Sequence, residues 1–332
     1  LAFVVAVLAA GGFGLLQRDF LRRVKQAPVE TLLRRPLASL QAHREAVELP
    51  TLRVHMKFRH YERILAKREE ALRNGVLQTS DHDLVPAEIE MDGERVKVRM
   101  RLKGDWPDHF EGEKWSYRVE VRGGRQVLGM RRFSLQHPAA RRYLAEWAYL
   151  ASARREGLLA PRYGFVRVIF NGDDKGIFAY EEHFAKELLE SQRRREGPIL
   201  KFDEGPLWEG RRRALATGRL DFTAFDRWSF RDARVDLFGE GSLREDSLLW
   251  DQAQAARRRL EAFQAGAPAS TVFEVDRMAT FLALTQVWGA THALIWHNLR
   301  FYADPVSTRL EPIAFDGEPM DWTREEMWQS HL

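Results

Sequence analysis

Cysteine is absent from this chain of 332 residues. Its absence excludes disulfides, Cys-ligated zinc sites and thiol catalysis. Lysine is scarce, since only nine of the 52 Lys and Arg residues are lysines, so a lysine inside a motif carries more weight than usual. The net charge is only +4 and the basic residues are interspersed with 48 acidic ones, so we expect no nucleic-acid partner.

The commonest nucleotide and zinc signatures are also missing. The sequence contains no G-x-x-x-x-G-K-[ST], no G-x-G-x-x-G and no H-E-x-x-H. Ser134, His137 and His183 could serve a Ser-His-Asp hydrolase, but no G-x-S-x-G motif supports one. A hydrolase therefore stays an alternative that ranks below the two hypotheses given at the end of the sequence analysis.

Long apolar runs are few. The stretch "LAFVVAVLAAGGFGLL", Leu1–Leu16, has no charge and is followed by the basic "QRDFLRRVK". It is shorter than the roughly 20 residues that span a bilayer, but it begins at Leu, so we expect further residues upstream. We predict a transmembrane anchor or signal segment at 1–16, through which the chain meets a membrane; the alternative is a buried helix. A second run, Val275–Trp296, is interrupted by charged and polar residues and predicts a buried helix instead.

Three regions follow from these patterns. Residues 17–48 are polar and Arg-rich, and we predict a helical stalk interrupted by Pro36. Residues 49–332 form the main domain. The final "EEMWQSHL" resembles no natural domain end, so we expect part of this domain to lie beyond Leu332.

Alternating and helical patterns succeed one another in the main domain. They predict an α+β domain with an antiparallel sheet in its first half and a more helical second half. The expected strands are 49–58, the hairpin "VPAEIEM–DGE–RVKVRMRLKG", 114–121, 131–136 and the hairpin "YGFVRVIFNGDDKGIFAYEEHF". The expected helices are the segment before Gly75, 141–158, the segment around "AKELLESQ" and 275–296.

One hairpin carries the residues that suit phosphoryl transfer. In "HNLRFYADPVSTRLEPIAFDGEP", His297–Pro319, Asn298 and Asp316 stand at the two ends, and amide and carboxylate oxygens are the ligands that Mg²⁺ prefers. Lys114, in "EKWSYRVEV", is a candidate for holding phosphate, with Glu146 as its ion-pair partner. Lys103, in "RLKGDW", competes for the same role.

Four stretches together resemble the CotH kinase-like family, named for a bacterial spore-coat protein. They are "LKGDWPDHFEGEKWSYRVEV", "YGFVRVIFNGDDKGIFAYEEHF", "GPILKFDE" and the hairpin above, and the resemblance runs from about Leu49 to the end. It implies an atypical protein-kinase-like, two-lobed fold that binds ATP and Mg²⁺ and phosphorylates Ser residues of proteins.

The resemblance also assigns residues. Lys114 matches the Lys of the family's K-x-S-Y strand, and Glu182 matches the Glu that ends its N-G-x-x-x-G hairpin. Lys201 falls on the Lys after the following helix, Asn298 on the Asn before the aromatic strand, and Asp316 on the first metal-binding acid.

Three positions depart from the family's pattern. A kinase-type catalytic loop has an Asp five residues before the metal-binding Asn, but here that position is Ala293, next to His292. We expect either that His292 is the catalytic base or that catalysis has been lost. Glu318 takes the place of the second metal-binding acid, and "LKGDW" replaces the family's Gly-Asn-Ser loop, which puts the role of that loop over phosphates in doubt.

Our hypothesis is therefore a membrane-anchored, extracytoplasmic protein of the bacterial cell envelope. We expect it to use ATP and Mg²⁺ to phosphorylate a protein Ser or a surface-polymer hydroxyl. The alternative is a catalytically inactive, envelope-anchored binding or scaffold protein of the same family.

Overall fold

The computed structural model describes residues 48–218 and 230–319. The anchor predicted at 1–16 and almost all of the stalk predicted at 17–48 lie outside these residues. Contacts group Pro50–Leu332 into one unit. Among the described residues, none of the helices is both long enough and apolar enough to cross a bilayer.

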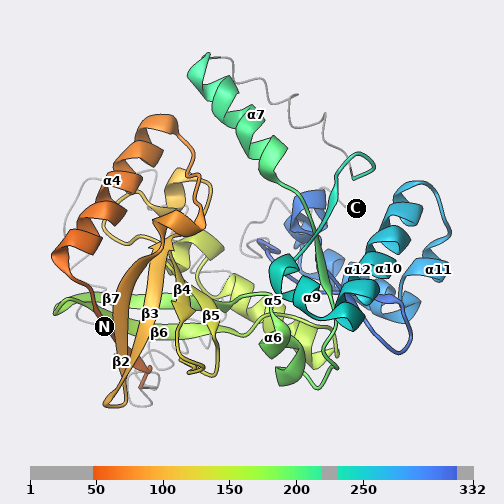
Figure 1. Cartoon of the computed structure of the whole chain (residues 1–332), viewed down its shortest axis with the longest axis horizontal. Coiled ribbons are helices and arrows are strands. Elements are labelled where there is room, and N and C mark those ends of the chain that lie inside the picture. Colours follow the sequence, from red (N-terminus) through yellow and green to blue (C-terminus); the bar gives the residue numbers. More distant parts are fainter. Residues whose placement is uncertain (1–47, 219–229, 320–332) are drawn as a thin grey trace, which may run out of the picture. The chain divides into compact units, whose positions relative to one another are not determined.

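Seven strands close into a barrel in the order β1-β2-β3-β4-β5-β7-β6 (Figure 1). Neighbouring strands are antiparallel except β1 and β6, which are parallel with Val54 opposite Phe170. Alternate residues of β3, such as Val98 and Met100, are buried in the barrel's core. The strands are β1 (Thr51–His55), β2 (Val85–Met91), β3 (Glu94–Leu102), β4 (Tyr117–Val121), β5 (Arg132–Gln136), β6 (Tyr163–Phe170) and β7 (Asp173–Glu182).

The two-lobed, kinase-like architecture expected from the sequence is wrong. The first-half sheet is a closed barrel, because β1 pairs with β2 on one side and with β6 on the other. Alternation of apolar residues identifies a strand but not its partners. The closure joins segments more than 100 residues apart in the sequence, and no local pattern announces it.

Helix α4 (Phe58–Asn74) packs against β2 and β3. Its Ile64 and Ala71 are buried in the barrel's core. The helix ends at Gly75, whose φ of 69° is left-handed, as the sequence predicts. The remaining elements before the second sheet are η1 (Asp81–Asp83), η2 (Pro107–His109), η3 (Pro138–Arg141), α5 (Ala145–Arg155) and α6 (Lys186–Ser191).

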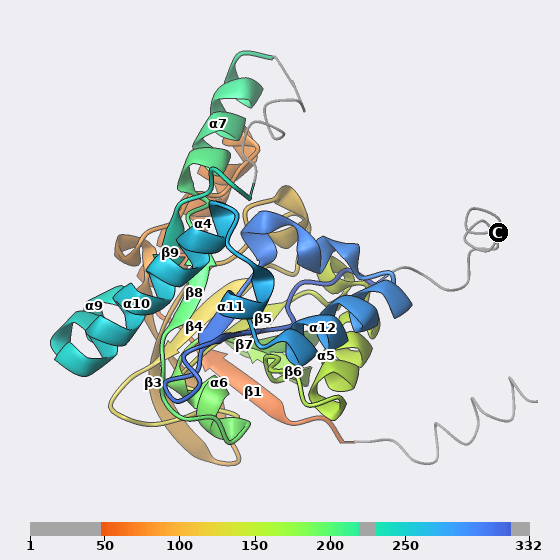
Figure 2. The same ribbon diagram turned by 90° about the vertical axis from the view of Figure 1, so that its right-hand side faces the viewer.

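A second, four-stranded sheet has the order β11-β10-β8-β9. Its β10 (Phe301–Ala303) and β11 (Leu310–Pro312) form the antiparallel hairpin predicted from the sequence. The other strands are β8 (Ile199–Phe202) and β9 (Val235–Leu237). Helix α10 (Ser247–Gln264) packs against this sheet (Figure 2). The other helices of this half are α7 (Gly205–Ala216), α9 (Glu240–Glu245) and α11 (Ala269–Val272).

The long helix predicted over Val275–Trp296 is shorter in the structure. Helix α12 (Val275–Val287) is followed by Gly289, which has a left-handed φ of 58°. Two 3₁₀ turns then follow, η4 (Thr291–Leu294) and η5 (Trp296–Asn298). His292 and Asn298 therefore lie in consecutive tight turns and not on a helix.

Candidate active site

The acidic loop Asp316–Gly317–Glu318 follows β11. Asp316 and Glu318 both have left-handed backbones, with φ of 52° and 44°. Gly317 lies between Tyr149 and Ala290, so a Cβ placed on it would be 2.7 Å from the tyrosine ring. The backbone N–H groups of Gly317 and Glu318 donate to the Glu146 carboxylate at 3.1–3.2 Å. Glu146, at the start of α5, thus holds the backbone of the loop in place.

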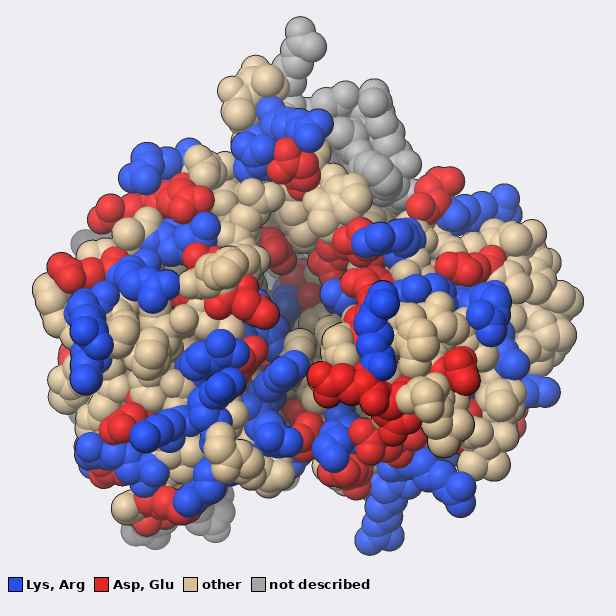
Figure 3. Space-filling view, in the orientation of Figure 1, with Lys and Arg blue, Asp and Glu red and all other residues tan. Residues whose placement is uncertain are grey.

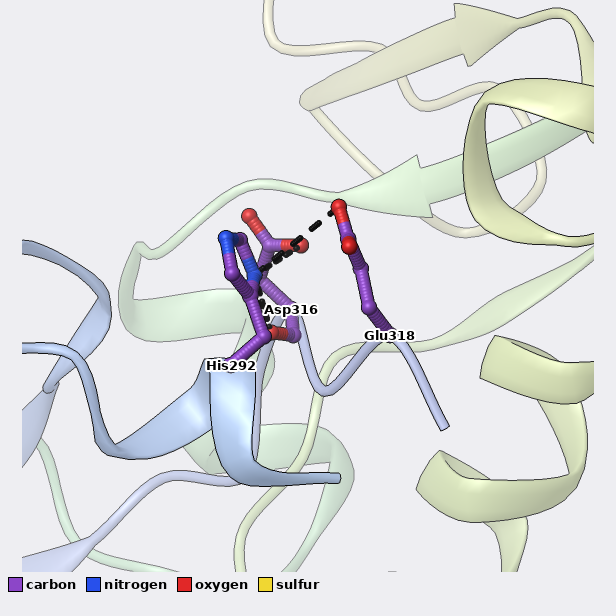
Figure 4. A group of neighbouring side chains, drawn as sticks. All are labelled: His292, Asp316 and Glu318. Carbon is purple, nitrogen blue, oxygen red and sulfur yellow. Dashed lines mark hydrogen bonds and ion pairs between the residues drawn. The ribbon is translucent and has the colours of Figure 1, made fainter. Parts of the chain in front are cut away.

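His292, Asp316 and Glu318 converge on one point (Figure 4). One potential ligand atom from each lies within 4.8 Å of the others. His292 Nδ1 is 3.0 Å from the Asp316 carbonyl oxygen and 3.4 Å from Asp316 Oδ1. Nδ1 is the ring nitrogen that faces the two acids, and it also lies 3.1 Å from Asn298 Nδ2, so it donates to the Asp316 carbonyl oxygen when protonated and can accept from Asn298 when it is not.

Asn298 holds His292 in place. It is buried, and its Nδ2 donates to the His292 carbonyl oxygen at 3.0 Å. Its side-chain oxygen has no hydrogen-bond donor among the residues that the structure describes. This oxygen is therefore free to accept a further hydrogen bond or a cation.

Arg141 is the closest cation to this cluster, and sequence analysis did not identify it. The residue is buried, with its Nη1 2.5 Å from Asp316 Oδ1 and 3.8 Å from Glu318 Oε1. Burial alone would raise the pKa of Asp316, but Arg141 and His292 hold it well below its ordinary value. Asp316 Oδ1 thus lies between two basic groups, the Arg141 guanidinium at 2.5 Å and the His292 imidazole at 3.4 Å.

The donor set fits a divalent cation. It offers two carboxylates and an imidazole nitrogen whose ligand atoms lie within 4.8 Å of one another. A bound cation would share Asp316 with the Arg141 guanidinium. Burial alone would lower the pKa of His292, but the hydrogen bond to Asp316 and the charges of Asp316 and Glu318 outweigh it and raise that pKa. A cation in this place would therefore favour the neutral imidazole.

Lys103, just after β3, is the lysine that lies near this cluster. Its Nζ contacts Gln136 Oε1 at 2.9 Å and Glu181 Oε1 at 3.2 Å. Burial lowers the pKa of Lys103, with Glu181 opposing and the charges of Arg141 and Asp316 also acting on it. The ion pair Lys103–Glu181 thus brings the barrel strands β3, β5 and β7 to the site.

The loop after Lys103 is tightly built. Gly104 has a φ of 96°, and a Cβ placed on it would be 2.1 Å from the His109 ring. Burial and the nearby Glu204 carboxylate raise the pKa of the next residue, Asp105, to about 7. Figure 3 shows a hollow near the middle of this face, with acidic and basic side chains around it.

Three of the residues assigned from the resemblance are engaged elsewhere. Lys114 donates to the Ile177 carbonyl oxygen at 3.2 Å and lies over the Phe178 ring. Glu182 accepts a bidentate pair of bonds from Arg162, and Lys201 pairs with Asp236 at 3.2 Å. Glu146 contacts the acidic loop and not Lys114.

The residues that sequence analysis missed are Arg141, Gln136 and Glu181. Arg141 stands in the Arg-rich "HPAARRY", where nothing distinguishes a buried arginine from an exposed one. Gln136 ends β5 and Glu181 is the penultimate residue of β7, and both are buried. A polar residue at the end of an otherwise apolar strand was the available signal for each.

A family model described as CotH kinase protein matches residues 100–330, more than half of the chain. The chain belongs to the CotH family. No curated protein matches the chain. The matched residues of this CotH protein include Lys103, Arg141 and the whole cluster around Asp316. Membership of the family suggests a kinase-like function for the protein.

Proposed function

We propose that this CotH protein transfers a phosphoryl group from ATP, with Mg²⁺, to a hydroxyl of a protein Ser or of an envelope polymer. The observation that carries the proposal is the convergence of His292, Asp316 and Glu318 beside the Lys103–Glu181 pair. Phosphoryl transfer needs charge stabilisation and positioning more than covalent catalysis, and this arrangement supplies both.

Each residue has a distinct role in the proposal. Asp316, Glu318 and the amide oxygen of Asn298 would hold Mg²⁺, which when bound neutralises charge on the phosphate oxygens. Lys103 and Arg141 are the cations placed to donate to those oxygens. His292, whose Nδ1 lies 3.0 Å from the Asp316 carbonyl oxygen, would accept the proton of the attacking hydroxyl. Lys114, Glu182 and Lys201 support the surrounding structure.

Binding without turnover is the second candidate. Ala293 is buried and stands where a kinase-type loop has its Asp, and Arg141 already neutralises Asp316. A protein of this kind would bind nucleotide through the same cations and transfer nothing.

The experiment uses the full chain in detergent with γ-labelled ATP. Binding of ATP and transfer of label are measured with Mg²⁺ and with EDTA. We expect both activities with Mg²⁺, and we expect Asp316→Asn to abolish transfer while Asp251→Asn, an exposed change on α10, has no effect. Binding without transfer would favour the second candidate. Neither binding nor transfer with any divalent ion would reject the proposed function.

Location is part of the proposal. The uncharged segment 1–16 would anchor the protein in a bacterial envelope, with the CotH domain on the extracytoplasmic side. Protease added to intact cells would then digest the domain. Protection from the protease in intact cells but not in lysed cells would place the domain inside.

A further inference from the structure

The barrel contains a cavity at the end that lies away from α5 and the acidic loop. It lies between the first turn of α4 and the turn that joins β6 to β7, and its volume is about 300 Å³. Its walls are the aromatic rings of Tyr61, Trp115, Tyr117, Phe170 and Phe178, and Met100 forms part of its base. Ligand pockets of this volume, lined by aromatic side chains with a few polar groups, hold small organic molecules.

The walls are flat and pre-positioned. Tyr61 and Trp115 stack with ring centroids 5.9 Å apart and planes 11° apart. Tyr117 and Phe170 stack at 5.8 Å and 25°. Arg68 lies over the Trp115 ring at 4.7 Å and fixes it from outside. These contacts hold the rings in place, so an aromatic ligand can pack against their edges and remaining surface without first ordering the side chains.

Tyr117 supplies the polar feature of the cavity. The residue is 7% exposed and lines the cavity, and its hydroxyl has no hydrogen-bond partner among residues 48–218 and 230–319. Burial raises the pKa of this phenol, so the group remains an O–H. The oxygen is not among the fully buried atoms without a partner, so it is open to the cavity and can exchange a hydrogen bond with a polar atom of a ligand.

The charges around the entrance favour an uncharged ligand. Asp173 and Lys175 pair at 2.6 Å, and Glu113 lies beside them on the lining. The outer faces of Trp115 and Phe178 are already covered by Arg68 and Lys114. Cations and acids thus balance locally, and the ring faces best suited to a cationic ligand are occupied.

We propose that this cavity is a binding site for a small uncharged aromatic compound of one or two rings whose polar group hydrogen-bonds to the Tyr117 hydroxyl. The site is separate from the cluster around Asp316 and does not depend on phosphoryl transfer. Its occupant would stiffen the barrel by filling the space between α4 and the β6–β7 turn.

The test measures binding of 2-naphthol and of naphthalene to the full chain by calorimetry and by displacement. We expect one 2-naphthol per chain, bound about 5- to 10-fold more tightly than naphthalene because of one neutral hydrogen bond. In Tyr117→Phe, which keeps the ring and the fold, that preference should disappear while naphthalene binds as before. Tyr143→Phe, an exposed change outside the cavity, and Asp316→Asn should leave both affinities unchanged.

Leu135→Trp fills the cavity and should abolish binding of both compounds, with circular dichroism confirming the fold. If this variant does not fold, the Tyr117→Phe comparison still decides. No binding of either compound, or an unchanged preference for 2-naphthol in Tyr117→Phe, would overturn the proposal.

Discussion

Asp316 is held by neighbours from separate parts of the chain. Its left-handed φ of 52° is strained, at a cost on the order of 1–3 kcal/mol for a residue other than glycine. Arg141 binds its carboxylate, and Glu146 binds the next two backbone N–H groups. The strain persists because these contacts over-determine the loop, and it turns Asp316 and Glu318 toward one point.

Gly317 is the residue that allows this close packing. Gly317→Ala would place a methyl group 2.7 Å from the ring of Tyr149, which is fully buried and cannot move aside. We expect the free energy of unfolding to fall by about 1–3 kcal/mol, measured by urea titration. Gly241→Ala on α9 meets no atom within 4 Å and should change stability little. Equal effects of the two changes would contradict the packing described for Gly317.

His292 is the proposed base. His292→Ala should lower phosphoryl transfer by roughly 10²- to 10⁴-fold, because a positioned general base contributes about that much. ATP binding should stay within a few-fold of wild type, since Lys103 and Arg141 remain. Filter binding and a transfer assay on the same sample separate the two effects. Unchanged transfer would remove His292 from the mechanism.

Glu146 should make stability depend on pH. Burial, with the charge of Asp316, raises the pKa of Glu146 to about 7 in the folded chain from an ordinary 4.5. Between these values the folded state binds the extra proton, so this residue's contribution to stability is full below about pH 4.5 and is lost as pH rises through 7. Glu146→Gln keeps an acceptor for Gly317 N–H, and it should gain about 1–3 kcal/mol relative to wild type between pH 5 and pH 8. A constant difference in urea titrations at the two pH values would contradict this.

At the scale of elements, the barrel depends on its first strand. β1 pairs with β2 on one side and with β6 on the other. The β1–β6 pair is the only parallel pair among the described strands of the barrel. Leu52 and Val54 place fully buried side chains from β1 into the core. A short strand therefore joins two hairpins that would otherwise each have a free edge.

Local elements could be predicted from the sequence, and their pairing could not. The Asp92–Gly93 turn and the left-handed Gly75 after α4 were readable because they depend on residues within a few positions. The end of α12 was missed because apolar residues continue past Gly289 into two 3₁₀ turns. Asp316 and Asn298 were identified by type and order, whereas Arg141 and Glu181 join them only through the long-range fold.

Leu52→Ala tests the closure of the barrel. The side chain is fully buried, so its truncation should lower the free energy of unfolding by about 2–5 kcal/mol. Leu248→Ala on α10 removes a side chain that is 65% exposed and should change stability by no more than about 0.5 kcal/mol. Urea titration of both variants gives the comparison. A loss below about 1 kcal/mol for Leu52→Ala would mean that β1 adds little to the barrel.

At the scale of the molecule, the site joins the barrel to the hairpin of the second sheet. Gln136 and Glu181 come from barrel strands, Lys103 directly follows β3, and Arg141 ends the turn η3 before α5. Asp316 comes from the segment after β11. Because charged contacts join these segments, loss of any one of the contacting residues should change the geometry of the site.

Arg141→Gln removes the cation that compensates the buried Asp316. The variant should lose about 3–5 kcal/mol in EDTA at pH 7, because an unpaired carboxylate then stays buried. The pKa of Asp316 is lower in the folded chain than in the unfolded chain, so its ion pair stabilises the fold above the unfolded-state pKa. This stabilisation is lost as pH falls through the folded-state pKa. The destabilisation caused by Arg141→Gln should therefore shrink in acid.

Two further measurements decide whether charge is the cause. Asp316→Asn added to Arg141→Gln should restore much of the stability in EDTA, since neither partner is then charged. Millimolar Mg²⁺ should stabilise Arg141→Gln more than it stabilises wild type, because the metal replaces the missing guanidinium at Asp316. A double variant no more stable than Arg141→Gln would attribute the loss to packing of the arginine side chain. An equal effect of Mg²⁺ on wild type and variant would place the metal away from Asp316.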